Sequence, residues 1–165
     1  MRKQYVGSVG WRSAIKTEVK KALSDSVKRN IAGKITLKKV TKLLESRNAG
    51  IRNIALKFLV ARNSTKREAI INLLEKAKNF PKENQKALIN AISVWCKDVE
   101  LIKPLFYWLT VKATREATEQ AIQELCKTDL VKGSKMLFLY GLQNKDPEIS
   151  SSARTILQGL HIKIQ

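Results

Sequence analysis

Four lysines between residues 34 and 42 have the type and spacing to bind a polyanion. Lys34, Lys38 and Lys42 are spaced i, i+4 and i+8, so in a helix they share one face, with Lys39 beside them. Like charges four residues apart destabilise a helix by roughly a few tenths of a kcal/mol per pair, and no Glu is interleaved here. The spacing favours a lysine face that contacts an anion, although a solvated face in a lysine-rich chain has the same pattern.

The net charge of the chain is concentrated in its first half. Thirty-two Lys and Arg stand against fourteen Asp and Glu, a net charge of +18, and residues 1–50 contribute +10 of it. Such a concentration costs stability through self-repulsion and favours a polyanionic partner, above all nucleic acid. We therefore predict that nucleic acid binds to Arg12, Lys16, Lys20, Lys21, Lys28, Arg29, Lys34, Lys38, Lys39, Lys42, Arg47, Arg52 and Arg67.

The kind of basic residue indicates how the polymer is recognised. Twenty-three are Lys and nine are Arg, and Lys contacts phosphate as a point charge, whereas bidentate reading of base edges favours Arg. The sequence shows no zinc-finger spacing, no aromatic platform interleaved with basic residues and no compact helix-turn-helix pattern. We expect backbone binding with weak sequence specificity. DNA and RNA, single and double strands stay open, and so does the alternative of an adaptor that binds an acidic protein segment.

Other chemistry has little support in the sequence. His161 is the only histidine, and a lone histidine cannot build a metal site or a nucleophile–base pair. Cys96 and Cys126 suggest no disulfide framework, so we expect them to be buried in a protein of a reducing compartment, the cytoplasm. No phosphate loop and no apolar run of the ~18 residues needed to span a membrane occurs. We expect no cofactor, no metal and no catalytic residue, and the oligomeric state is left open.

Helices must position the lysine face, because apolar residues recur at the helical period almost throughout the chain. Leu37, Val40 and Leu44 form a stripe opposite the lysines, and residues 48–50 should end it. Further helix starts are indicated by a capping-box pair, a first-turn proline and two N-cap aspartates, namely Thr65 with Glu68, Pro81, Asp98 and Asp146. The fold class is predicted to be all-α.

The helical pattern repeats along the chain. Four alanines, each followed four residues later by a large apolar residue, mark the repeat: Ala55, Ala91, Ala121 and Ala153, followed by Leu59, Trp95, Leu125 and Leu157. Residues 105–108 are echoed 32 residues later by residues 137–140, so Tyr140 falls in the register of Trp108. We expect both aromatic residues, and Trp95, to pack in the core. One repeat cannot bury its apolar face alone, which favours stacked helix pairs.

Two of these repeats resemble the second helix of HEAT-like repeats, through Ile51-Arg52 with Ala55 and Leu59, and through Ile149 with Ala153 and Leu157. The resemblance implies a right-handed α-solenoid of about four antiparallel helix pairs and a role as a binding scaffold. The pairs would cover residues 35–63, 65–97, 98–128 and 129–160 approximately. An extra helix over 10–30 and a flexible basic arm over 1–9 would precede them, with residues 10–165 forming a single domain.

The resemblance also suggests a lower-ranked enzymatic alternative, because some HEAT-like solenoids are DNA glycosylases that remove alkylated bases. Sites of that family combine an aromatic wall, a carboxylate and a basic residue. The corresponding candidates here are Trp95, Asp98, Trp108 and Arg115. Asp98 is also placed to cap a helix and both tryptophans suit a core, so we expect a protein without enzymatic activity.

Overall fold

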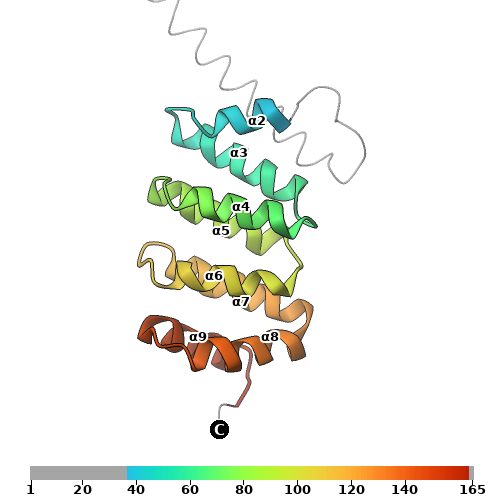
Figure 1. Cartoon of the computed structure of the whole chain (residues 1–165), viewed down its shortest axis with the longest axis vertical. Helices are drawn as coiled ribbons and strands as arrows, with labels where there is room; N and C mark the ends of the chain where they lie inside the picture. The colour runs from blue at the N-terminus through green and yellow to red at the C-terminus, as the bar shows by residue number, and fades with distance from the viewer. Residues whose placement is uncertain (1–36, 164–165) are drawn as a thin grey trace, which may run out of the picture. The chain divides into compact units, whose positions relative to one another are not determined.

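Helices make up all the regular structure between residues 37 and 163, the part of the chain that this computed structural model describes (Figure 1). That part contains no strand, which confirms the all-α prediction. The chain divides into two compact units, Met1–Arg62 and Asn63–Gln165. The helix predicted over 10–30 and the arm over 1–9 lie outside the described residues, and the single domain over 10–165 stays a prediction.

The described part of the first unit, residues 37–62, contains two helices that pack against each other, α2 (Leu37–Leu43) and α3 (Ala49–Arg62). Val40 of α2 is fully buried, and so is Leu56 of α3. The sequence predicts that the apolar stripe of this helix ends at residues 48–50, but α2 already ends at Leu43. Asn48 instead starts α3, because its Oδ1 accepts the Ile51 N–H at 3.1 Å and satisfies a backbone donor that the first turn leaves free.

The second unit is built from short helices joined by tight turns. In chain order they are α4 (Arg67–Ala77), α5 (Lys82–Trp95), the 3₁₀ turn η2 (Val99–Leu101), α6 (Ile102–Leu109), α7 (Arg115–Thr128), α8 (Leu130–Met136), the π-helical segment η3 (Leu137–Leu142) and α9 (Pro147–Gly159). Helix α7 packs against α5 and α9, and α6 packs against α7, α8 and α9 (Figure 1). Successive helices therefore pack against their neighbours, while the right-handed solenoid stays a prediction.

Two of the three predicted side-chain caps of this unit are present. Asp98 accepts the N–H of Glu100 at the start of η2, and Asp146 accepts the N–H of Glu148 at the start of α9. The capping box at Thr65 is wrong, because the N-cap of α4 is Lys66 and no side chain accepts a hydrogen bond there. Thr65 lies one residue too early, in the turn, for its hydroxyl to serve this helix.

The repeated alanines all lie in the core, but only one of the three aromatic residues expected there is fully buried. Trp108 is 1% exposed, as predicted. Trp95 is only partly buried, because it is the last residue of α5. Tyr140 is 44% exposed, so its predicted place in the core is wrong.

The π-helical segment explains the exposure of Tyr140. Met136 and Leu137 are buried. Tyr140 lies four residues after Met136 and three after Leu137, so a regular α-helix would place it on the same buried face. A π-turn shifts the register by one residue, so Gly141 takes the buried position instead. A Cβ at Gly141 would lie 2.7 Å from the Ala153 Cβ, so the glycine allows η3 to approach α9 closely.

A second close approach, at Gly133, yields a prediction. A Cβ there would lie 2.9 Å from the Cys126 Cα, which is backbone and cannot rotate away. Gly133→Ala should therefore lower the free energy of unfolding by about 1–3 kcal/mol, although alanine is the better helix former by about 0.5–1 kcal/mol. Urea denaturation followed by circular dichroism measures the change.

Gly159→Ala is the matched control for this helical glycine. Its added methyl would meet only the side-chain amide of Gln123, at 3.1 Å, and that flexible group can move. The control should be as stable as the unmodified protein or slightly more stable. Equal stability of the two variants would contradict close packing of α8 on α7.

Candidate functional site

The predicted cations fall into three groups. Outside the described residues lie Arg12, Lys16, Lys20, Lys21, Lys28, Arg29 and Lys34. Lys38, Lys39 and Lys42 belong to α2, Arg47 to the turn after it and Arg52 to α3. Arg67 is the first residue of α4 and belongs to the second unit. The structure therefore places five of the thirteen in α2, α3 and the turn between these two helices.

We call residues 37–62, which comprise α2, α3 and the turn between them, the basic segment. It contains seven basic residues and a single acidic one, Glu45. Lys39 and Lys42 are exposed on α2, whose Val40 is fully buried, and Arg47 is exposed in the turn. One carboxylate cannot neutralise seven cations, so the segment keeps a strong positive charge.

Arg52 has a structural task within the basic segment. Its guanidinium donates to the Ser46 carbonyl oxygen at 2.5 Å, and its side chain is only partly exposed. The Ser46 hydroxyl oxygen in turn accepts the Asn48 N–H at 3.2 Å. Arg52 therefore holds the turn between α2 and α3, which carries the exposed Arg47.

Arg67 is already neutralised by a carboxylate. Its Nε and Nη2 donate to the two carboxylate oxygens of Asp98 at 2.6 and 3.0 Å, in the two-point geometry that arginine favours. This hydrogen bonding lowers the pKa of Asp98 below its usual value and raises the pKa of Arg67. The pair ties the start of α4 to the start of η2, so Arg67 is a weaker candidate for nucleic acid than the basic segment.

Ion pairing is a general property of the second unit. Sixteen basic and eleven acidic residues lie between 63 and 165, against sixteen and three between 1 and 62. Five ion pairs join its described residues: Arg67–Asp98, Lys78–Glu75, Arg115–Glu148, Lys127–Glu124 and Lys132–Glu100. The excess charge of the protein therefore belongs mainly to residues 1–62, which contribute +13 of the +18.

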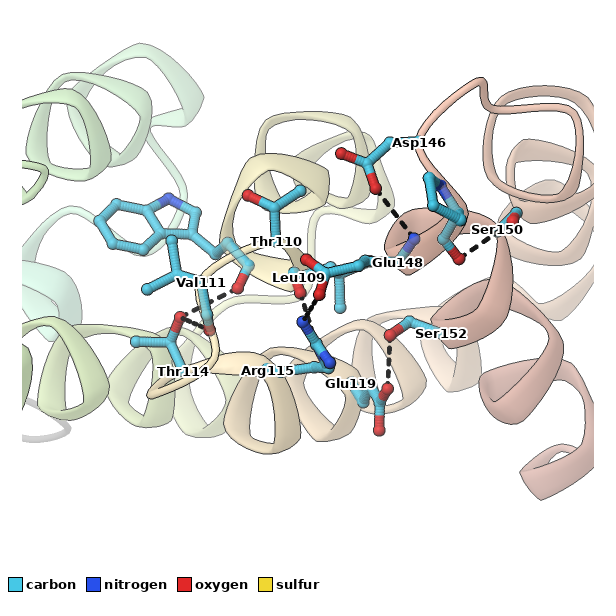
Figure 2. Close-up of polar contacts among 12 residues, drawn as sticks. Leu109, Thr110, Val111, Thr114, Arg115, Glu119, Asp146, Glu148, Ser150 and Ser152 are labelled. Atoms are coloured by element: carbon cyan, nitrogen blue, oxygen red, sulfur yellow. Dashed lines mark hydrogen bonds and ion pairs between the residues drawn. The ribbon is translucent and has the colours of Figure 1, made fainter.

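The candidates for a glycosylase site are engaged in packing and structural contacts. Asp98 pairs with Arg67, and Trp108 is buried. Arg115 lies between the Leu109 carbonyl oxygen, 2.8 Å from its Nε, and the Glu148 carboxylate, 2.5 Å from its Nη2 (Figure 2). Trp95, the fourth candidate, is partly buried at the end of α5. Asp98, Trp108 and Arg115 therefore each have a structural role in this unit.

The contacts of Arg115 belong to a polar network that fixes the turn between α6 and α7 against the start of α9 (Figure 2). The hydroxyl of the fully buried Thr114 donates to the Trp108 carbonyl oxygen at 2.9 Å. The Ser152 hydroxyl donates to Glu119 at 2.5 Å, which joins α9 to α7. Because the buried hydroxyl groups of Thr114 and Ser152 each have a partner, the network stabilises the packing of α7 and α9.

Of the remaining reactive side chains, the two cysteines are buried and the histidine is exposed. Both cysteines are free and buried as predicted, and burial raises the pKa of Cys96 to about 11 and that of Cys126 to about 12. His161 is exposed after α9, beside a depression of about 460 Å³ that Lys127 also lines. Within residues 37–163, no group of three or more His, Cys, Asp or Glu could hold a metal ion.

The second unit also contains an arrangement that the sequence did not reveal. The Lys78 Nζ lies 4.5 Å from the ring centroid of Tyr107, and the Lys103 Nζ lies 4.2 Å from that of Tyr140. Both tyrosines are nearly half exposed. Each lysine is far from its tyrosine in the sequence, so residue spacing could not predict the contact. The signal that could have indicated it is an aromatic residue placed on the exposed face of a helix.

No family model, no curated protein and no solved structure matches this chain. The HEAT-like resemblance therefore stays a prediction. Between residues 37 and 163, no helix is long and apolar enough to cross a membrane.

The Arg67–Asp98 pair predicts a pH-dependent stability. Because the folded-state pKa of Asp98 lies below its usual value of 3.8, the contribution of the pair is present above pH 3.8 and is lost as the pH falls through the lowered pKa. Asp98→Asn removes the charge but keeps an oxygen that can cap η2. The variant should be less stable at pH 7 by about 0.2–1 kcal/mol, and urea denaturation at successively lower pH should show this difference vanish.

Glu45→Gln is the control, since Glu45 is exposed and forms no ion pair with any residue between 37 and 163. Its stability should follow that of the unmodified protein at every pH. A difference for Asp98→Asn that persists at low pH would show that charge is not the cause.

Thiol reactivity tests the burial of the two cysteines. Only a thiolate attacks a disulfide reagent, and at pH 8 roughly a thousandth or less of each folded-state thiol is ionised, given the pKa values of about 11 and about 12. An aromatic disulfide reagent should therefore modify the folded protein at least about a hundredfold more slowly than the urea-unfolded protein. A folded-state thiol that reacts as fast as a free cysteine would contradict the placement of Cys96 or Cys126.

Proposed function

We propose that this protein binds the backbone of nucleic acid without catalysing a reaction, and that the basic segment is the contact surface. One observation carries the proposal: residues 37–62 hold seven basic residues against one acidic residue, with Lys39, Lys42 and Arg47 exposed. The cations predicted between residues 12 and 34 lie outside the described residues and remain part of the prediction. Cations placed close together repel one another and lower the stability of the protein, and a bound polyanion would offset this repulsion.

The chemistry of the segment favours phosphate over base edges. Lysine contacts phosphate as a point charge, and the structure already engages Arg52 in a turn. We therefore propose weak sequence specificity and a steep dependence on salt. If six to ten phosphates are contacted, the affinity falls by about 10³–10⁵-fold between ~50 and ~200 mM salt.

The scaffold in this proposal is a HEAT-like right-handed α-solenoid of antiparallel helix pairs. The packing of α7 against both α5 and α9 supports it, because each of these is the second helix of a predicted pair. Free buried cysteines fit a reducing compartment such as the cytoplasm. A binding scaffold needs no catalytic group, in keeping with the engaged polar residues of the second unit.

Charge reversal tests the proposed surface. Lys39→Glu, Lys42→Glu and Arg47→Glu together should lower the dependence of log affinity on log salt by about three, one for each phosphate contact removed. Fluorescence anisotropy measures this with labelled duplex DNA, single-stranded DNA, duplex RNA and hairpin RNA, each across a salt series. The full-length protein must first be freed of bound nucleic acid.

A control with the same change in net charge separates a specific surface from the total charge. Lys82→Glu, Lys112→Glu and Lys145→Glu together alter three exposed lysines of the second unit. The control should change the salt slope by less than about one. Equal losses in both triple variants would refute the basic segment as the surface, and failure of every polymer to bind at physiological salt would favour an acidic protein partner.

A further inference from the structure

Lysine and tyrosine alternate along one line in the second unit. Lys78, at the end of α4, lies over the ring of Tyr107 on α6, and Lys103 on α6 lies over the ring of Tyr140 on η3. Lys103 and Tyr107 are one helical turn apart, so they share a face of α6. The four residues therefore follow one another across three elements in the order Lys78, Tyr107, Lys103 and Tyr140, which we call the Lys–Tyr row.

Both rings of the row are available to a ligand. Tyr107 is 46% exposed, although its neighbour Trp108, which it meets edge-on at 5.3 Å, is 1% exposed. Tyr140 is exposed only because the π-helical segment displaces it from the core. A π-turn is uncommon within a helix and often accompanies a functional site, so the exposure of Tyr140 calls for a use of its ring.

We propose that the Lys–Tyr row binds unpaired nucleotides of single-stranded nucleic acid, an inference that rests on the proposed function and extends it. Aromatic rings stack with any base, and lysines between them contact the phosphates that join the bases. A cation over an exposed ring is held weakly, and stacking of a base is the stronger interaction. Each lysine can therefore leave its tyrosine for a phosphate.

The charges around the row agree with this ligand. The acid that pairs with a member of the row is Glu75, whose carboxylate lies 2.7 Å from the Lys78 Nζ and is 62% exposed. Such an exposed pair contributes little and gives way to a phosphate. Duplex nucleic acid keeps its bases stacked inside, so it can use the lysines of the row but not the rings.

The test replaces each ring by an apolar side chain without a π-face. In the full-length protein, Tyr107→Leu and Tyr140→Leu should each weaken binding of a labelled oligothymidylate by about fivefold to a hundredfold, and leave binding of a duplex of the same length unchanged. Tyr107→Phe and Tyr140→Phe keep the ring and should restore single-strand affinity. Circular dichroism and the unfolding temperature establish that each variant is folded.

Leu139→Ala is the matched control, since Leu139 precedes Tyr140 in η3 and is 45% exposed. It should leave oligothymidylate binding unchanged, and a loss equal to that of Tyr140→Leu would overturn the stacking role. Leucine variants that bind oligothymidylate normally would also overturn the inference, while duplex binding that depends on Lys39, Lys42 and Arg47 would leave the proposed function standing. If neither polymer binds, the proposed function fails and the inference with it.

Discussion

The burial of α7 is the interaction on which the second unit depends. Its Ala121, Ile122 and Leu125 are fully buried, and the helix packs against α5, α6, α8 and α9. Removing apolar surface from water is worth roughly 25 cal/mol per Å², but it has no direction, so it does not by itself set the spacing of the helices. Close approaches at Gly133 and Gly141 set that spacing, because any larger side chain there would push α8 or η3 away.

Charge is distributed in a different way from apolar packing. In the described part of the second unit, carboxylates meet cations in five ion pairs, and three of these join one element to another, as between Arg115 of α7 and Glu148 of α9. Exposed pairs of this kind add little stability. The carboxylates of the second unit hold its net charge to +5, against +13 for the first unit. The basic segment has no comparable supply of carboxylates. A polyanion approaching the protein would therefore be attracted mainly by the first unit, and would meet the rings of the second unit only at short range.

Sequence patterns correctly predicted features that depend on residues close together in the sequence, namely the helices and two of their caps. Helices follow from the apolar period, and Asp98 and Asp146 cap because a cap involves residues two positions apart. The prediction failed where a shift of one residue along the helix decided which residue is the N-cap, as at Thr65, or which side chain is buried, as at Tyr140. The cations of the basic segment could be identified from composition, but the engagement of Arg52 and Arg67 depends on partners that folding brings near. The Lys–Tyr row could not be identified, since its members come from three separate elements.

The π-helical segment makes the surface of the second unit sensitive to chain length. A π-turn accommodates one residue more than an α-turn over the same rise, so η3 can be regarded as an insertion that the helix has absorbed. Loss of Phe138 or Leu139 would restore the α-helical register with Gly141 three residues after the buried Leu137, so the close approach to Ala153 could be kept while the surface side chains before it are rearranged.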